Sequence, residues 1–338
     1  VATGHRAMLA NVSPSKNVAV GDSAMRVMNG TANGIANCVA IGANAFYGNA
    51  DNTTTGANGT VAIGKDALFS LTTGAGNIAI GENTGKYVTT GANNIGLGQY
   101  SLGGNVTTAL TGGGNIAIGK NTLRDIQGGA EANICIGKDA GLDLSGSYNV
   151  LIGQDAGDSL AGQTHNTAIG TDALGASNAV DQAVVVGSQA GMGAMTANAD
   201  GTVLMGYSAG ASVTTGNGNT MIGYIAGTDI TTGGGNTIIG YQALTNAQSG
   251  VDNSTVIGWK AGQKLGDDGD SGDNHSEANI IIGAGTMDGG HNTLANNTAN
   301  HNIAIGNNAL GGNTGTTTSL TGTSNVVIGH DAMKVASS

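Results

Sequence analysis

One short pattern recurs along the whole chain and restricts what it can fold into. The pentapeptide NIAIG occurs at 77–81, 115–119 and 302–306, and looser copies fill the intervals. Each copy ends in a glycine, which we call the anchor glycine. The commonest spacing between anchors is 17 residues, with a range of 16 to 25, which predicts a repeat architecture of stacked units. The 17 anchors are Gly21, Gly42, Gly64, Gly81, Gly98, Gly119, Gly137, Gly153, Gly170, Gly187, Gly206, Gly223, Gly240, Gly258, Gly283, Gly306 and Gly329.

The three residues before each anchor predict a short strand. The residue directly before the anchor is always Ile, Val, Leu or Met, and the residue three before it is Val or Ile in 13 copies and Thr in four. Side chains of a strand alternate between two sides, and here both sides are apolar, so both must be buried. One side can fill the core of a solenoid coil. The other side needs a partner surface, which predicts an oligomer whose subunits meet along the strands.

Three more positions fit a tightly wound coil. The anchor glycine permits a corner with positive φ. The residue four before it is Asn in 12 of 17 copies, which predicts a ladder of amide side chains between coils. The residue three after it is always Ala, Ser or Thr, as a crowded place requires. We therefore predict an all-β fold, a parallel β-solenoid or β-roll of about 17 short coils. It divides into a lead-in segment at 1–16, regular repeats at 17–262 and repeats with longer insertions at 263–338.

Composition excludes several other classes of protein. The chain has 62 Gly and one Pro, but Gly does not recur at every third residue, so it is not collagen. It is rich in Ile and Val, unlike a disordered chain. The net charge of −11 repels phosphate backbones and predicts no binding of nucleic acid. No stretch approaches the roughly 18 apolar residues of a membrane span. Cys38 and Cys135 are expected to be two buried thiols rather than a disulfide.

The pentapeptide GYSAG at 206–210 matches the G-x-S-x-G pattern of serine hydrolases. Ser208, however, lies two residues after an anchor, at a position that holds Ile225, Gln189 or Asp139 in other copies. A nucleophile would need one special position, so we interpret the match as part of the repeat and expect no enzyme. A polysaccharide depolymerase, the catalytic alternative, would need paired carboxylates in a groove.

The residue directly after the anchor is aromatic in four successive copies, and stacked coils would place these side chains in one column. The four residues are Tyr207, Tyr224, Tyr241 and Trp259. One interpretation is an aromatic strip against which the sugar rings of a receptor pack. The other is an aromatic ladder that stabilises the solenoid. Both interpretations stay open from the sequence, and these four residues are the candidate receptor-binding site.

An acidic insertion at 263–278 carries carboxylates separated by glycines, an arrangement that can hold Ca²⁺. The candidate ligands are Asp267, Asp268, Asp270 and Asp273. Their spacing does not match the twelve-residue EF-hand loop, and a solvated acidic loop is the alternative. Three histidines near the C-terminal insertions form a second metal candidate: His275, His291 and His301. Apart from Ca²⁺, we expect no cofactor.

The pattern N-[IVT]-A-I-G-x-x-A-[LG], with Thr-Thr-Gly connections, resembles two related groups of repeats. One is the head repeat of YadA-like trimeric autotransporter adhesins, which builds a left-handed parallel β-roll in a trimer. The other is the NTAIGYQAL and TTG-type repeat of phage tail fibres, especially those that precede an endosialidase-type intramolecular chaperone. NTAIG at 166–170, NTIIGYQAL at 236–244 and the 17-residue spacing match the second group closely. The resemblance covers residues 17–333.

The resemblance implies an elongated homotrimer in the tail fibre of a virion, used to attach to the host cell. The implied partners are further copies of the chain, upstream fibre or tail proteins that continue from the lead-in segment, and a host cell-surface glycan, without membrane insertion. The alternative is the head domain of a bacterial surface adhesin, located on the bacterial cell surface. In the fibre family the chaperone typically cuts itself off after a Ser, which makes Ser338 a hypothetical processed end.

Overall fold

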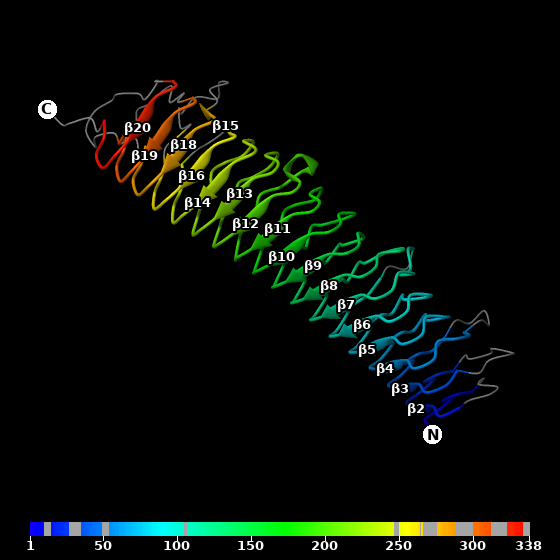
Figure 1. The fold of residues 1–338 in the computed structure, drawn as a ribbon. Helices are drawn as coiled ribbons and strands as arrows, with labels where there is room; N and C mark the ends of the chain where they lie inside the picture. Colours follow the sequence, from blue (N-terminus) through cyan, green and yellow to red (C-terminus); the bar gives the residue numbers. More distant parts are fainter. Residues whose placement is uncertain are drawn as a thin grey trace. The chain divides into compact units, whose positions relative to one another are not determined.

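A computed structural model describes most of the chain as two units, Val1–His165 and Asn166–Ser338, each of which we describe by itself. Both units consist of short strands, each paired in parallel with its neighbours and connected by turns (Figure 1). The described residues are 1–9, 15–26, 35–48, 54–104, 107–246, 250–263, 265, 276–287, 300–311 and 323–333. The prediction of an all-β parallel solenoid is confirmed. Packing divides the chain after His165, whereas the sequence-based division at 16 and 262 follows loop length.

The strands lie directly before the anchor glycines. In the first unit they are β1 (Ala2–Thr3), β2 (Val18–Val20), β3 (Val39–Ile41), β4 (Val61–Ile63), β5 (Ile78–Ile80), β6 (Ile95–Leu97), β7 (Ile116–Ile118), β8 (Ile134–Ile136) and β9 (Val150–Ile152). In the second unit they are β10 (Thr167–Ile169), β11 (Val184–Val186), β12 (Val203–Met205), β13 (Thr220–Ile222), β14 (Thr237–Ile239), β15 (Val251–Asp252), β16 (Thr255–Ile257), β17 (Ser276–Glu277), β18 (Ile280–Ile282), β19 (Ile303–Ile305) and β20 (Val326–Ile328). Among the described residues the one helix is a 3-10 turn, η1 (Ala197–Ala199), and none is long and apolar enough to cross a membrane.

Successive coils stack in register, so equivalent positions of the repeat lie next to each other. The middle residue of β5, Ala79, pairs with the middle residue of β6, Gly96. All 17 anchor glycines have φ between 131° and 145°, a region open in practice only to glycine. The predicted corner is therefore confirmed. Its backbone is tightly packed, because a Cβ on Gly137 would lie 2.3 Å from the carbonyl oxygen of Gly153 in the next coil.

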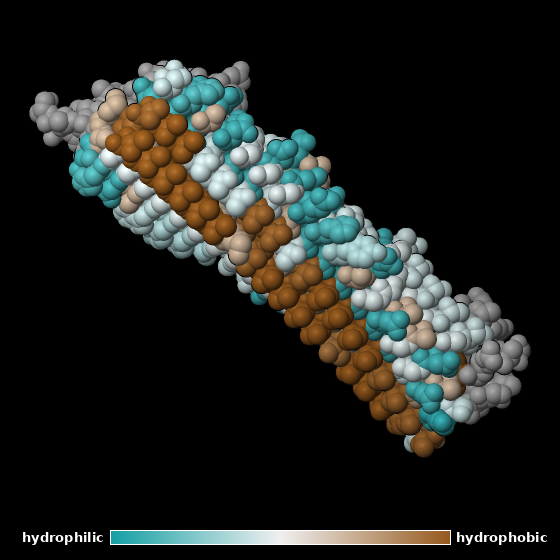
Figure 2. Space-filling model, viewed as in Figure 1, coloured by the Kyte–Doolittle hydropathy of each residue, from teal (hydrophilic) through white to brown (hydrophobic). Residues whose placement is uncertain are grey.

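The two sides of each three-residue strand differ in burial. The middle residue is buried in every such strand and faces the core. The first and third residues, which we call the outer strand residues, are half-buried or exposed, as Ile80 is at 40%. In Figure 2 they form a brown, hydrophobic stripe along the strands of each unit. Contiguous exposed apolar surface of this kind marks an interaction site in a soluble protein.

In several coils the core is filled by two positions that compensate each other in volume. In one of them the middle strand residue is the large Leu151, and the residue four after the anchor is Gly157. In another the middle residue is the small Ala117, and the equivalent place holds Leu123. A Cβ on Gly157 would lie 2.9 Å from Leu151 Cδ2, so the two positions share one space in the cross-section.

This shared space gives a testable swap. We expect Leu151→Ala to lower the free energy of unfolding by about 2–5 kcal/mol, because it leaves a cavity. Gly157→Leu alone is expected to overfill the same space. The double variant should recover most of the loss, because Leu123 occupies the equivalent place with φ 51° beside Ala117. Urea unfolding of the three variants measures the coupling. Strictly additive losses, with no recovery in the double variant, would contradict the shared space.

The predicted ladder of asparagine side chains is also confirmed. Asn115 Nδ2 donates to Asn94 Oδ1 at 3.0 Å, and Asn133 Nδ2 donates to Asn115 Oδ1 at 3.0 Å. The backbone amide of Asn133 donates to the same Oδ1 at 3.1 Å. The second unit has its own ladder, in which Asn236 Nδ2 donates to Asn219 Oδ1 at 3.1 Å. These side chains are buried, and each bond satisfies polar atoms that would be costly to leave unpaired.

The cysteines are free and buried, as expected from the sequence. Cys135 is the middle residue of β8 and fills the core, and burial raises the pKa of its thiol. Cys38 occupies the ladder position, where its Sγ donates to the carbonyl oxygens of Ala36 and Ala57 at 3.3 Å. Burial raises the pKa of the Cys38 thiol as well. Both thiols are thus small core residues held in the less reactive protonated form.

The lead-in segment contains a strand that the aliphatic pattern missed. β1 pairs with β2 in parallel, with Ala2 opposite Ala19. Gly4 has φ 129° and lies 17 residues before Gly21, so it takes the place of an anchor. The pattern overlooked it because Thr3 stands where every other copy has an aliphatic residue.

Candidate functional site

The four aromatic residues of the candidate receptor site lie in the second unit. Each directly follows the anchor glycine that ends strand β12, β13, β14 or β16. All four are about half exposed, from 45% for Tyr207 to 53% for Trp259. Their side chains are therefore accessible at the surface. We call Tyr207, Tyr224, Tyr241 and Trp259 the aromatic column.

The tyrosines of the aromatic column stack on one another. The ring centroids of Tyr207 and Tyr224 are 5.3 Å apart with an interplanar angle of 15°. Those of Tyr224 and Tyr241 are 5.2 Å apart at 9°. Lys260 Nζ lies 4.8 Å from the centroid of the Trp259 ring. Both faces of Tyr224 are therefore covered by neighbouring rings. Sugars pack on the faces of aromatic rings, so this geometry favours the stabilising ladder. Sugar binding at the aromatic column stays a prediction, and at Tyr224 it would have to use the ring edge and the hydroxyl.

The middle ring gives a direct test of the ladder. We expect Tyr224→Ala to lower the thermal unfolding midpoint, because it removes two stacked pairs worth about 0.5–1.5 kcal/mol each beyond their buried area. Tyr224→Phe keeps both stacks and should leave the midpoint nearly unchanged. Differential scanning calorimetry compares the two variants. An unchanged midpoint for Tyr224→Ala, together with lost binding to host cells, would instead favour the receptor strip.

Most of the metal candidates lie outside the described residues. Asp267, Asp268, Asp270 and Asp273 lie outside the described residues, as do His275, His291 and Ser338. His301 is described, and its backbone amide donates to the carbonyl oxygen of Glu277. Within the described ranges there is no group of three or more His, Cys, Asp or Glu side chains that could hold a metal ion. The calcium site in the acidic insertion stays a prediction.

Ser208 has the backbone of its repeat position. Its φ of 51° matches the 48° of Ile225, which occupies the same place one coil later. Its side chain is nearly buried, and Ser208 Oγ lies 3.5 Å from Gln189 Oε1, at the limit of a hydrogen bond. Gln189 cannot serve as a general base. This environment supports the interpretation that GYSAG belongs to the repeat.

A second cluster of aromatic and charged side chains lies in the first unit, where the sequence analysis proposed none. Successive coils place Arg26, Tyr47, Phe69 and Lys86 five residues after their anchors. The Tyr47 and Phe69 rings stack with centroids 4.9 Å apart at 13°. Arg26 donates to the Tyr47 hydroxyl, and its Cζ lies 5.4 Å from the ring centroid. Lys86 Nζ lies 6.0 Å from the Phe69 centroid, so two aromatic rings are enclosed between two cations.

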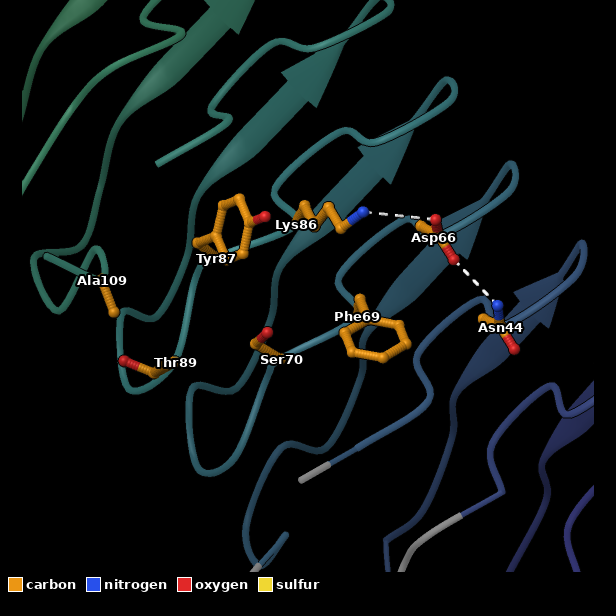
Figure 3. A pocket seen from close by; sticks show the side chains of 8 residues that line it. All are labelled: Asn44, Asp66, Phe69, Ser70, Lys86, Tyr87, Thr89 and Ala109. Carbon is orange, nitrogen blue, oxygen red and sulfur yellow. Dashed lines mark hydrogen bonds and ion pairs between the residues drawn. The ribbon is translucent and has the colours of Figure 1, made fainter. Parts of the chain in front are cut away.

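A surface hollow of about 560 Å³ lies beside the end of this stack. Figure 3 shows the Lys86 side chain extended toward Asp66, with the Tyr87 ring beside its backbone end and the Phe69 ring below its ammonium end in this view. We call this the first hollow, lined by Asn44, Asp66, Phe69, Ser70, Lys86, Tyr87, Thr89 and Ala109. Its size lies within the range of small-molecule sites.

A second hollow of about 420 Å³ adjoins the first and shares Asp66, Lys86 and Tyr87 with it. It lies where the next coil has Gly103 and Gly104, at the positions that hold Lys86 and Tyr87 in the preceding coil and Arg124 and Asp125 in the following one. A side chain cannot be added at Gly103 without a shift, because its Cβ would lie 2.6 Å from the Arg124 carbonyl oxygen. The glycine pair thus interrupts the row of side chains and leaves an open space.

The charges around the two hollows are paired. Lys86 Nζ lies 3.4 Å from Asp66 Oδ2, and Arg124 Nη2 lies 2.7 Å from Asp125 Oδ2. Lys65 Nζ lies 3.9 Å from Glu82 Oε1 at the rim of the second hollow. The contact with Asp125 raises the pKa of Arg124 further above its usual value, so the guanidinium stays charged. The charged residues that line each hollow are balanced in sign.

The spacing of the anchor glycines already indicated that this part of the chain differs from the regular repeat. The interval between Gly98 and Gly119 is 21 residues rather than 17, so this coil carries an insertion, and insertions are where function is expected on a repeat scaffold. The cluster was missed because residues at its positions differ in type from coil to coil. No protein-family model matches the chain, and a comparison with curated proteins gives no significant match.

Proposed function

We propose that this chain is the attachment segment of a phage tail fibre, a homotrimer of parallel β-solenoids with one coil for each of the 17 anchor glycines. It acts by binding rather than by catalysis and holds the virion to a glycan of the host surface. The repeat pattern that resembles such fibres supports the assignment. The observation that carries it is the apolar stripe of outer strand residues in each unit (Figure 2).

The apolar stripe needs a partner surface whose apolar residues recur with the same spacing. Outer strand residues such as Ile41, Ile80 and Ile136 are 36–40% exposed and recur in register, coil after coil. Burial of apolar surface contributes about 25 cal/mol per Å², so a row of such residues is a strong drive for association. A second and third copy of this chain present the same spacing of apolar residues. Association along the strands would bury all three stripes around one axis.

Three parallel copies would also suit attachment. Each weak receptor site would occur three times, and multivalent contact raises the overall avidity without any new contact at a single site. A bacterial adhesin head would use the same trimer, and the two functions differ in the domain that each would need after this segment. A chaperone domain supports the fibre, and a coiled-coil stalk with a membrane anchor supports the adhesin.

The solution mass tests the proposal. One chain has a mass of 32.8 kDa, and the expected result is an elongated particle of three times that mass by light scattering and sedimentation velocity. Binding of the fluorescently labelled particle to host cells, lost after enzymatic removal of their surface glycans, tests the attachment. A monomer with its apolar stripe exposed in solution would contradict the trimer, and cell binding that survives glycan removal would contradict the glycan receptor.

A further inference from the structure

The first hollow stays accessible in the proposed assembly. None of the residues that line it belongs to a strand, because all follow an anchor glycine within the turns of their coils. The apolar stripe consists of strand residues. A trimer packed along the strands would therefore use a different surface from the one that carries Phe69, Lys86 and Tyr87. A binding site at the hollow is compatible with association of the chains.

The aromatic walls of the hollow differ from the aromatic column in one respect. Phe69 has one face covered by Tyr47, at 4.9 Å between centroids, while Lys86 Nζ lies 6.0 Å from its ring centroid. Tyr87 has the same ammonium group 5.9 Å from its ring centroid and no ring stacked on it among the described residues. Phe69 therefore lies between the Tyr47 ring and the Lys86 ammonium group, whereas the Tyr87 ring lines the open space and can pack against the apolar C–H face of a sugar ring. Tyr224 of the aromatic column cannot, since both of its faces are covered.

The polar groups between these walls form a fixed network. Asn44 Nδ2 donates to Asp66 Oδ1 at 2.9 Å, and Lys86 Nζ donates to Asp66 Oδ2 at 3.4 Å and to Asn83 Oδ1 at 3.2 Å. Both bonds of Lys86 are long, so its ammonium group can turn a proton toward a ligand. Asp66 is only 13% exposed and is held in place from two sides. Such a pair offers one donor and one acceptor at a short separation, which matches two neighbouring hydroxyls.

The charge balance indicates the class of ligand. Asp66 and Lys86 are the charged residues that line the first hollow, one of each sign. The second hollow adds the pairs Lys65–Glu82 and Arg124–Asp125. A phosphate or a carboxylated sugar would have to displace a carboxylate from its cation. An uncharged sugar needs no such exchange, because its hydroxyls can donate to Asp66 and accept from Lys86.

We propose that the first hollow is a subsite for one uncharged pyranose residue of a surface polysaccharide, with the rings of Phe69 and Tyr87 as walls and the Lys86–Asp66 pair bonded to two neighbouring hydroxyls. The inference rests on the proposed attachment function and specifies its site and ligand. A single subsite of this kind binds weakly, and the copies in an oligomer supply avidity.

The test uses saturation-transfer NMR and titration of the whole chain with individual sugars. The probes are methyl α-glucopyranoside, methyl β-galactopyranoside, N-acetylglucosamine and, as an acidic sugar, N-acetylneuraminic acid. We expect at least one uncharged sugar to bind, and both Tyr87→Ala and Lys86→Met to weaken its binding by about tenfold, the size of losing one good contact. Tyr148→Ala is the control, because Tyr148 is an exposed tyrosine of the same unit that lies outside both hollows. It should bind as the parent does.

The outcomes separate this inference from the proposed function. If the Tyr87→Ala and Lys86→Met variants have the thermal unfolding midpoint of the parent and bind sugar as it does, the subsite is wrong. Binding of N-acetylneuraminic acid alone would overturn the uncharged ligand. If none of the sugars binds but the parent still attaches to glycan-bearing host cells, the subsite is wrong and attachment stands. If the parent neither binds sugars nor attaches to host cells, both proposals fail.

Discussion

Replacing Ile80 and Ile136 together with lysine will convert the proposed trimer into monomers of 32.8 kDa. Both are outer strand residues of the first unit, at 40% and 36% exposure, so the solenoid itself can accommodate the longer side chains at its surface. In a trimer packed along the strands, each substitution would place three ammonium groups in an apolar interface. Burying unpaired charges costs several kcal/mol each in proteins, which outweighs the apolar contacts that are left.

Light scattering combined with sedimentation velocity gives the mass of the variant, and circular dichroism reports whether its strands persist. Met192→Lys is the control, because Met192 is 42% exposed but lies in a turn, outside the strands. It should leave the mass at three chains. A double lysine variant that keeps the parent mass would show that the subunits do not meet along the strands, and the main physical support for the fibre would be lost.

Replacing the anchor Gly137 with alanine will destabilise the chain by about 3 kcal/mol or more. Its φ of 140° is a conformation essentially restricted to glycine, and strain of this kind costs about 1–3 kcal/mol. The new Cβ would also lie 2.3 Å from the Gly153 carbonyl oxygen, which belongs to backbone in the next coil. Backbone at this position cannot move without disturbing the pairing of β8 with β9. Two coils would therefore separate or distort.

Urea unfolding of Gly137→Ala against the parent measures the loss. Gly162→Ala serves as the matched control in the same unit, since a Cβ there meets nothing within 4 Å and its φ is not positive. This control should change the free energy of unfolding by no more than about 0.5 kcal/mol. Equal and small effects at both positions would mean that the corner relaxes easily and that anchors are not required by close packing.

The regular part of the fold could be predicted because its positions repeat. The apolar triplet, the anchor and the Asn position recur with one chemistry, so strands, corner and ladder follow from a single chain. The second and fourth residues after each anchor also have positive φ, as at Asp66 with 55° and Leu68 with 50°. That was not foreseen, because leucine disfavours this conformation locally. The packing of Leu68 against the core overrides the local preference.

The candidate sites show where such prediction stops. The aromatic column could be placed from spacing alone, but the distance between its rings could not, and that distance decides whether Tyr224 has a free face. The first hollow depends on residues that share no chemistry, such as Phe69 and Lys86, and the second hollow depends on the side-chain gap at Gly103. A hollow of this kind arises where small residues lie next to coils that carry large side chains. A pattern that counts similar residues does not detect this.

The in-register stacking of equivalent positions has a consequence for how such a chain can change in length. Each coil contacts its neighbours through the same positions, such as the Asn ladder and the closely packed backbone of the anchor glycines. Removing or duplicating one whole period within a unit would bring together surfaces that already fit. Recombination between copies of the repeat would thus often produce chains that still fold. The number of coils can therefore change during evolution, and with it the distance between the proposed receptor site and the ends of the chain.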